Sequence, residues 1–178
     1  MKMLKKLLAV VLTGAMALTL FTACGSNAVR DKDIADALNN IVKLNDSEVT
    51  FTPRAKEREM AQKLAALIES HSEDDSNSAE LSAKIQGILG IDQGGVNENN
   101  FVWVQNALTD KLGAEGQAFQ VMESLTDKGG AYNFSSLGSK EPADTRYMGT
   151  ALCKIPDQKD NLVTVRVIVV TAKAEDEE

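Results

Sequence analysis

The stretch LVTVRVIVVTA, residues 162–172, decides the fold class of this chain. Most of its side chains are β-branched, and such residues favour an extended backbone. Alternate residues of a strand point to opposite faces of a sheet, and here both faces are apolar. One face carries Val163, Val165, Val167 and Val169, and the other carries Leu162, Ile168 and Val170 with Thr164 and Arg166. We therefore predict a strand that is covered on both faces.

Two shorter segments predict partners for this strand. Residues 147–155 alternate in polarity and are joined to it by a turn over 156–161, which indicates an antiparallel pair. Residues 47–52 alternate around Val49 and Phe51 and predict a short third strand. Apolar residues spaced by three and four predict helices at five other places, residues 31–45, 53–71, 78–89, 101–112 and 117–127. The segment FVWVQ at the start of 101–112 also fits a strand, and we predict the helix.

These elements predict one α+β domain over residues 31–173, in which helices enclose a small antiparallel sheet as a three-layer α-β-α sandwich. The second helix, over 53–71, has a charged side that we expect to face solvent, made of Arg54, Lys56, Glu57, Arg58, Glu59 and Lys63. Residues 174–178 read as an acidic, disordered tail.

The first 24 residues resemble a targeting sequence. Residues 1–23 combine a lysine-rich start with an uncharged apolar run, which is typical of a secretory signal peptide. Cys24, followed by Gly25, looks like the lipid attachment site of a bacterial lipoprotein, with residues 24–30 as a polar tether. Two alternatives are a permanent transmembrane helix, for which the apolar run is short, and simple secretion with cleavage after Ala28.

Net charge and cysteine content limit which binding partners and which disulfides are expected. Without residues 1–23, 16 basic and 26 acidic residues remain, a formal net charge of −10. Nucleic acid is excluded as a partner because phosphate binding needs a basic face. We expect contact with the membrane only through lipid on Cys24. Cys153 is then the one free thiol; it lies mid-strand among apolar neighbours, and we predict a core residue without a disulfide.

The sequence offers little catalytic chemistry. His71 is the single histidine, and with one core cysteine it makes a tight zinc site improbable, so we expect no metal. No phosphate loop, dinucleotide fingerprint or serine-nucleophile elbow occurs, and we expect no cofactor. The aromatic residues Trp103, Tyr132, Phe134 and Tyr147 could line a groove, although core positions are the more frequent use of such side chains.

Several short stretches occur in the order of the motifs of one known family. Read together they resemble the CAP superfamily, the secreted cysteine-rich and pathogenesis-related fold. The stretches are Leu38-Asn39, His71-Ser72, Ile85 with Gly90, Glu98-Asn99, Val121-Met122-Glu123-Ser124 and Met148-Gly149-Thr150-Ala151.

The resemblance implies the three-layer sandwich and a cleft lined by His71, Glu98, Asn99 and Asp127. Where the family has a second histidine, this chain has Asp127, so the implied cleft lacks the pair that holds a divalent metal in the family. The resemblance therefore implies a binding role for a small molecule, a lipid or a surface protein.

We accordingly expect a lipid-anchored domain on the extracytoplasmic face of a cell membrane that binds rather than catalyses. The alternative is a cell-envelope hydrolase with Glu98 as base and His71 as acid or orienting group. A third possibility is a structural lipoprotein without a cleft.

Overall fold

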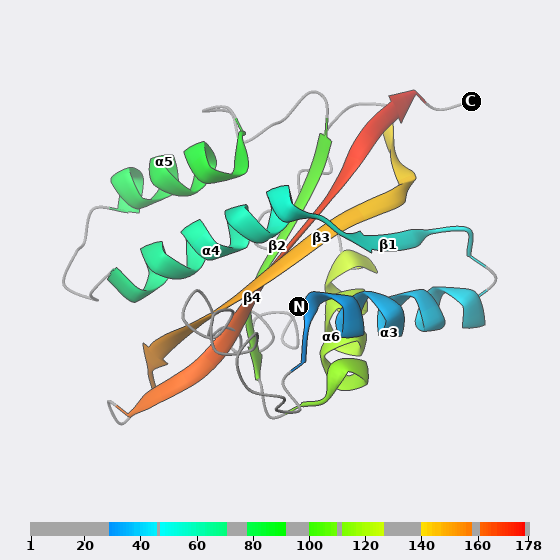
Figure 1. Cartoon of the computed structure of the whole chain (residues 1–178). Helices are drawn as coiled ribbons and strands as arrows, with labels where there is room; N and C mark the ends of the chain where they lie inside the picture. The colour runs from blue at the N-terminus through cyan, green and yellow to red at the C-terminus, as the bar shows by residue number, and fades with distance from the viewer. Residues whose placement is uncertain are drawn as a thin grey trace.

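The computed structural model of the chain describes residues 29–45, 47–70, 78–91, 100–109, 112–126, 140–157 and 161–176. These segments form helices and a four-stranded sheet, and the fold is α+β as predicted (Figure 1). None of the helices in this part of the chain is long and apolar enough to cross a membrane. The elements in chain order are α3 (Asp31–Leu44), β1 (Thr50–Pro53), α4 (Ala55–Ser70), α5 (Ser78–Leu89), β2 (Asn100–Thr109), α6 (Ala114–Thr126), β3 (Lys140–Pro156) and β4 (Leu162–Asp176).

The sheet has the strand order β1-β3-β4-β2. β3 and β4 form the long antiparallel hairpin that the sequence predicts, and β2 adds antiparallel to β4. β1 runs parallel to β3, so the sheet is mixed, and the prediction of an antiparallel sheet is wrong at this strand. The parallel pairing follows from the connection: β1 reaches β3 through α4, α5, β2 and α6, not through a hairpin turn.

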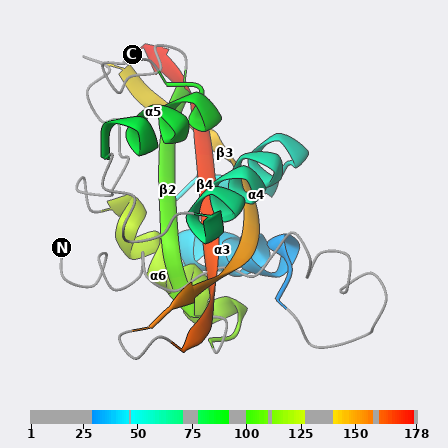
Figure 2. The same cartoon turned by 90° about the vertical axis from the view of Figure 1, so that its left-hand side faces the viewer.

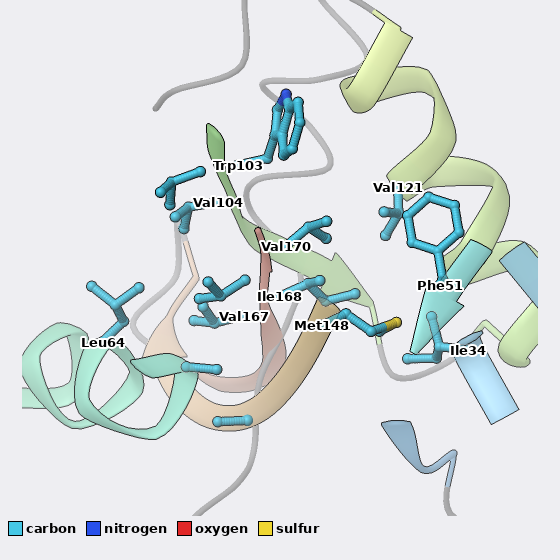
Figure 3. Close-up of a cluster of buried hydrophobic side chains, with 14 of the residues drawn as sticks. Ile34, Phe51, Leu64, Trp103, Val104, Val121, Met148, Val167, Ile168 and Val170 are labelled. Atoms are coloured by element: carbon cyan, nitrogen blue, oxygen red, sulfur yellow. The ribbon is translucent and has the colours of Figure 1, made fainter. Parts of the chain in front are cut away.

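Both faces of β4 are buried, as its sequence predicts. Val167 and Val169 are 0% exposed, and Ile168 and Val170 are 1% exposed. Figure 3 shows Val167 on the side of Leu64 from α4, whereas Ile168 lies with a second group of side chains. That group comprises Ile34 of α3, Phe51, Val121 of α6, Met148 and Val170.

Two hydrogen bonds fix which helix lies on which side of the sheet. Glu57 of α4 accepts a bond from Thr171, and Asp31 of α3 accepts one from Thr150. Thr150 of β3 pairs with Ile168 of β4, so these two side chains lie on the same face of the sheet. Ile168 and Thr171 are three residues apart along β4, so their side chains point to opposite faces. Thr150 and Thr171 therefore lie on opposite faces of the sheet. α4 therefore packs on one face, with α5 against it, while α3 contacts α6 and begins on the other face (Figures 1 and 2).

Gly149 lets α4 approach β3 closely. A Cβ atom at this position would overlap the backbone of Glu57 and Arg58 in the first turn of α4. The next residues on the same side of β3, Ala151 and Cys153, are small and buried, so α4 can also pack closely over them. The helix axis therefore lies nearer the sheet than larger side chains would allow.

Side chains complete the hydrogen bonding along the β1–β3 edge. The Asn39 amide donates to the Phe51 carbonyl at 3.0 Å and accepts from the Phe51 N–H at 2.7 Å. The Arg54 N–H donates to the Met148 carbonyl at 2.8 Å, just beyond the end of β1. Further along β3, the Glu69 carboxylate accepts from the Lys154 N–H at 2.6 Å. These contacts satisfy backbone groups that an edge strand would otherwise leave to solvent.

The sequence predictions fail at two other places. Residues 101–112 were expected to form a helix, but Asn100–Thr109 is strand β2, and residues 101–105 are all buried. Five consecutive buried residues fit a strand with cover on both faces, and the antiparallel pairing with β4 decides for the strand. Residues 174–176, expected in a disordered tail, continue β4 and pair with residues 140–142 of β3. The helix end at Gly90 is confirmed by its φ of 66°, a conformation that glycine adopts without strain.

Substitution of Gly149 by alanine tests the close approach of α4. We expect Gly149→Ala to lower the free energy of unfolding by roughly 3 kcal/mol or more, because rigid backbone must move to admit the methyl group. Gly87→Ala in α5 is the matched control, since a Cβ there meets nothing within 4 Å. A helix-interior glycine replaced by alanine should raise stability by about 0.5–1 kcal/mol. Urea denaturation measures both, and equal stabilities of the two variants would contradict the packing described.

Candidate functional site

The residues predicted for the site lie outside the part of the chain that the structure describes. This holds for the lipidation site Cys24 and for the whole predicted cleft, His71, Glu98, Asn99 and Asp127. Among the described residues, no group of three His, Cys, Asp or Glu side chains is placed to hold a metal ion. The cleft and the lipid site therefore stay predictions from the sequence.

The described segments next to His71 and Glu98 end at opposite ends of the sheet. Glu69, near the end of α4, bonds to Lys154, which is opposite Thr164 of β4. Asn100, the first residue of β2, is opposite Lys173 of β4. Nine residues of strand separate the two β4 positions, which corresponds to about 30 Å.

A shallow groove lies between α4 and α5, with a volume of about 670 Å³. Its lining is mostly apolar and includes one lysine from each helix. The residues that line it are Lys63, Ala66, Leu67 and Ser70 from α4, and Lys84, Gly87 and Ile88 from α5. We call this feature the α4–α5 groove.

Lys63 and Lys84 make equivalent ion pairs on their own helices. Lys63 lies 2.7 Å from Glu59, and Lys84 lies 2.7 Å from Glu80, each one turn earlier. The hydrogen bond from each lysine lowers the pKa of its glutamate. All four side chains are more than half exposed, and exposed pairs of this kind contribute little to stability.

Glu57 is fully buried, although its place on the charged side of α4 predicted exposure to solvent. Arg54 donates to it from both Nε and Nη2, and Thr171 donates to it at 2.8 Å. The Arg54 guanidinium in turn lies 3.7 Å from the centre of the Tyr147 ring. Burial raises the pKa of Glu57, but the bonds from Arg54 and Thr171 outweigh it, and the net pKa is lowered. An ionised, enclosed carboxylate of this kind holds α4 to β4 and is not suited to proton transfer.

A second polar network joins the start of the domain to both sheet and helices. Asp31, 5% exposed, accepts from Arg58 at 2.7 Å and from Thr150 at 2.6 Å. Arg166 donates to Thr150 at 3.1 Å and to the Val29 carbonyl at 2.9 Å. Residue 29, expected in the polar tether, is therefore bound to the sheet.

The aromatic residues that could line a groove divide into three cases. Trp103 is 8% exposed, stacks on Phe101 at 5.7 Å between ring centres, and so belongs to the core. The guanidinium of Arg146 also lies over the Trp103 ring, 5.2 Å from its centre. Tyr147 packs under Arg54, and the remaining two candidates, at 132 and 134, lie outside the described residues.

Cys153 is a buried free thiol, as predicted. Burial, with a smaller contribution from Glu69, raises its pKa to about 12. A thiol in this state is protonated at neutral pH and is a poor nucleophile.

A search of protein-family models, curated proteins and solved structures finds no match to this chain.

The α4–α5 groove is the one feature of the site that sequence reasoning did not find. Lys63 reads as part of a solvated helix face, and Lys84 lies on a different helix. The two come together only because α5 packs against α4, and the segment between the helices carries no pattern that predicts this contact. The i to i+4 spacing of Glu59 with Lys63 and Glu80 with Lys84 is visible in the sequence but is common on exposed helices.

Replacing Glu57 by glutamine tests the buried ion pair. We expect Glu57→Gln to lower the free energy of unfolding by about 1–3 kcal/mol, a range reduced by the partial exposure of Arg54 to water. The lowered folded-state pKa means that the carboxylate stabilises the fold above its ordinary pKa of 4.5. This stabilisation is lost as pH falls through the folded-state pKa.

The difference in free energy of unfolding between wild type and Glu57→Gln should therefore be constant above about pH 5 and shrink below pH 4.5. Thermal denaturation from pH 3 to 7 measures this difference. Glu59→Gln is the control, because its exposed pair with Lys63 contributes little. A difference that grew on acidification would contradict the direction of the pKa shift.

Proposed function

We propose that the protein is a lipid-anchored module on the extracytoplasmic face of a membrane, with a CAP-like three-layer α-β-α fold, that binds a ligand without transforming it. The observation that carries the binding role is the α4–α5 groove, whose lining is mostly apolar and includes two lysines. The anchor is supported by the signal segment and Cys24. The three-layer arrangement is supported by the positions of α4 and α3 on opposite faces of the sheet.

The chemistry of the groove favours one class of ligand among those left open by the sequence. Ala66, Leu67 and Ile88 offer contact to an apolar chain, and Lys63 and Lys84 offer two positive charges. A molecule that matches both features is an anionic amphiphile, such as a long-chain carboxylic acid. Each lysine is paired with a glutamate, Glu59 or Glu80, so an anionic head group would compete with that glutamate for the ammonium group.

The hydrolase alternative uses His71 and Glu98. The described segments next to them end about 30 Å apart along the sheet, and this supports the binding role over the enzyme. A catalytic pair needs its two groups within hydrogen-bond reach or one water molecule apart.

Charge reversal at both groove lysines tests the ligand class. We expect Lys63→Glu with Lys84→Glu to weaken binding of a fluorescent long-chain carboxylic acid by roughly tenfold, because each reversal replaces an attractive ammonium with a carboxylate that repels the ligand. Fluorescence titration measures the Kd. Lys32→Glu is the control, because Lys32 is also an exposed lysine in an i to i+4 pair, with Asp36, outside the groove. Equal affinities in all three proteins would contradict a ligand in the groove.

Mass spectrometry of the protein isolated from bacterial membranes tests the anchor. We expect a mature chain that begins at a diacylglyceryl-modified Cys24. Cys24→Ser should abolish the modification and release the domain from membranes, because the acyl chains supply about 0.8 kcal/mol for each buried methylene. An unmodified chain that begins at Val29 would instead show ordinary secretion.

A further inference from the structure

A buried glutamine without hydrogen bonds lies between β2 and α6. Gln105 of β2 is 4% exposed, and within the described part of the chain neither its Nε2 nor its Oε1 atom has a hydrogen-bond partner. Gln105 pairs with Ile168 of β4, so its side chain lies on the α3 side of the sheet. α6 contacts β2, and its Val121 lies in the same group of side chains as Ile168 (Figure 3). The amide of Gln105 is therefore covered by the layer to which α6 belongs.

α6 itself carries two amide oxygens that accept no hydrogen bond. Gln117 is 0% exposed, and its Nε2 donates to the Leu112 carbonyl at 2.7 Å, but its Oε1 has no donor among the described residues. The Oε1 atom of Gln120 is buried in the same condition. With α6 in place, these groups and the Gln105 amide have lost their hydrogen bonds to water and gained none in return. The closed position of α6 is destabilised to that extent.

α4, on the other side of the sheet, is held by polar groups that are satisfied. Glu57 accepts a hydrogen bond from Thr171, and Glu69 accepts one from the Lys154 N–H. Movement of α4 away from the sheet would break these bonds, whereas movement of α6 allows new bonds to water. The buried apolar side chains described on α6 are Ala118 and Val121, and those on α4 are Ala61, Leu64 and Ala65. Apolar packing therefore does not reverse the difference between the two helices.

We infer that α6 opens from the sheet as a unit while α4 and the β3–β4 hairpin stay folded, and that the buried glutamines between β2 and α6 favour this opening. Local opening of this kind has a lower free energy than global unfolding. It hydrates Gln105 and gives a small molecule access to the α3 side of β2, on the opposite side of the sheet from the α4–α5 groove. Neither the lipid anchor nor a ligand in the groove is needed for this motion.

Native-state hydrogen exchange of the purified full chain, followed by NMR at several low urea concentrations, tests the motion. We expect the backbone amides of α6 to be exposed at least about tenfold more often than those of α4, because opening of α6 forms hydrogen bonds to water that the closed state lacks. We also expect the exchange of α6 to depend less on urea, since a local opening exposes less surface than global unfolding. Equal protection and equal urea dependence in the two helices would overturn the inference.

Gln105→Met removes the unpaired amide and keeps an unbranched side chain. We expect this variant to slow the exchange of α6 by roughly tenfold, because its closed state no longer holds an unsatisfied group at position 105. Gln105→Leu is a second apolar variant with the same expected direction. Gln86→Met is the control, since Gln86 is a partly exposed glutamine of α5, and it should leave the exchange of α6 unchanged. If α6 exchanges as fast as in the wild type, or faster, in both Gln105 variants, its opening does not hydrate this amide and the inference fails.

Discussion

The approach of the α4 backbone to β3 at Gly149 is the constraint on which the other contacts depend. The missing side chain lets the first turn of α4 rest directly on the strand. From there Glu57 reaches Thr171 on β4, and Arg58 reaches Asp31 at the start of α3. The same helix ends with Glu69 on the backbone of β3. One close contact thus positions three polar connections, to the sheet centre, to the other helix layer and to the sheet edge.

Both polar clusters place charge inside the domain and compensate for it locally. Glu57 and Asp31 are almost completely buried, yet each accepts hydrogen bonds from an arginine and from a threonine. A buried carboxylate without such partners would be strongly destabilising. These bonds are directional, so they also fix the rotation of α4 and α3 relative to the sheet, which apolar packing alone specifies less tightly.

The sequence predicted the elements whose pattern is strong and failed where two patterns compete. The valine-rich stretch 162–172 fits only a strand. Caps and apolar periodicity correctly predicted four of the five expected helices. In 101–112, apolar residues at helical spacing coincide with a run of five buried residues, and pairing with β4 decides in favour of the strand. The site could not be predicted, because Lys63 and Lys84 meet only in the packed structure. Glu57 was read as exposed because charge on a helix face gives no sign of an arginine and a threonine that enclose it.

Asn39 has a consequence beyond the stability of β1. Its side-chain amide occupies both the N–H and the carbonyl of Phe51, the groups through which a strand from another molecule would add to the sheet. A single amide that blocks strand addition at this edge therefore limits growth of the sheet from molecule to molecule.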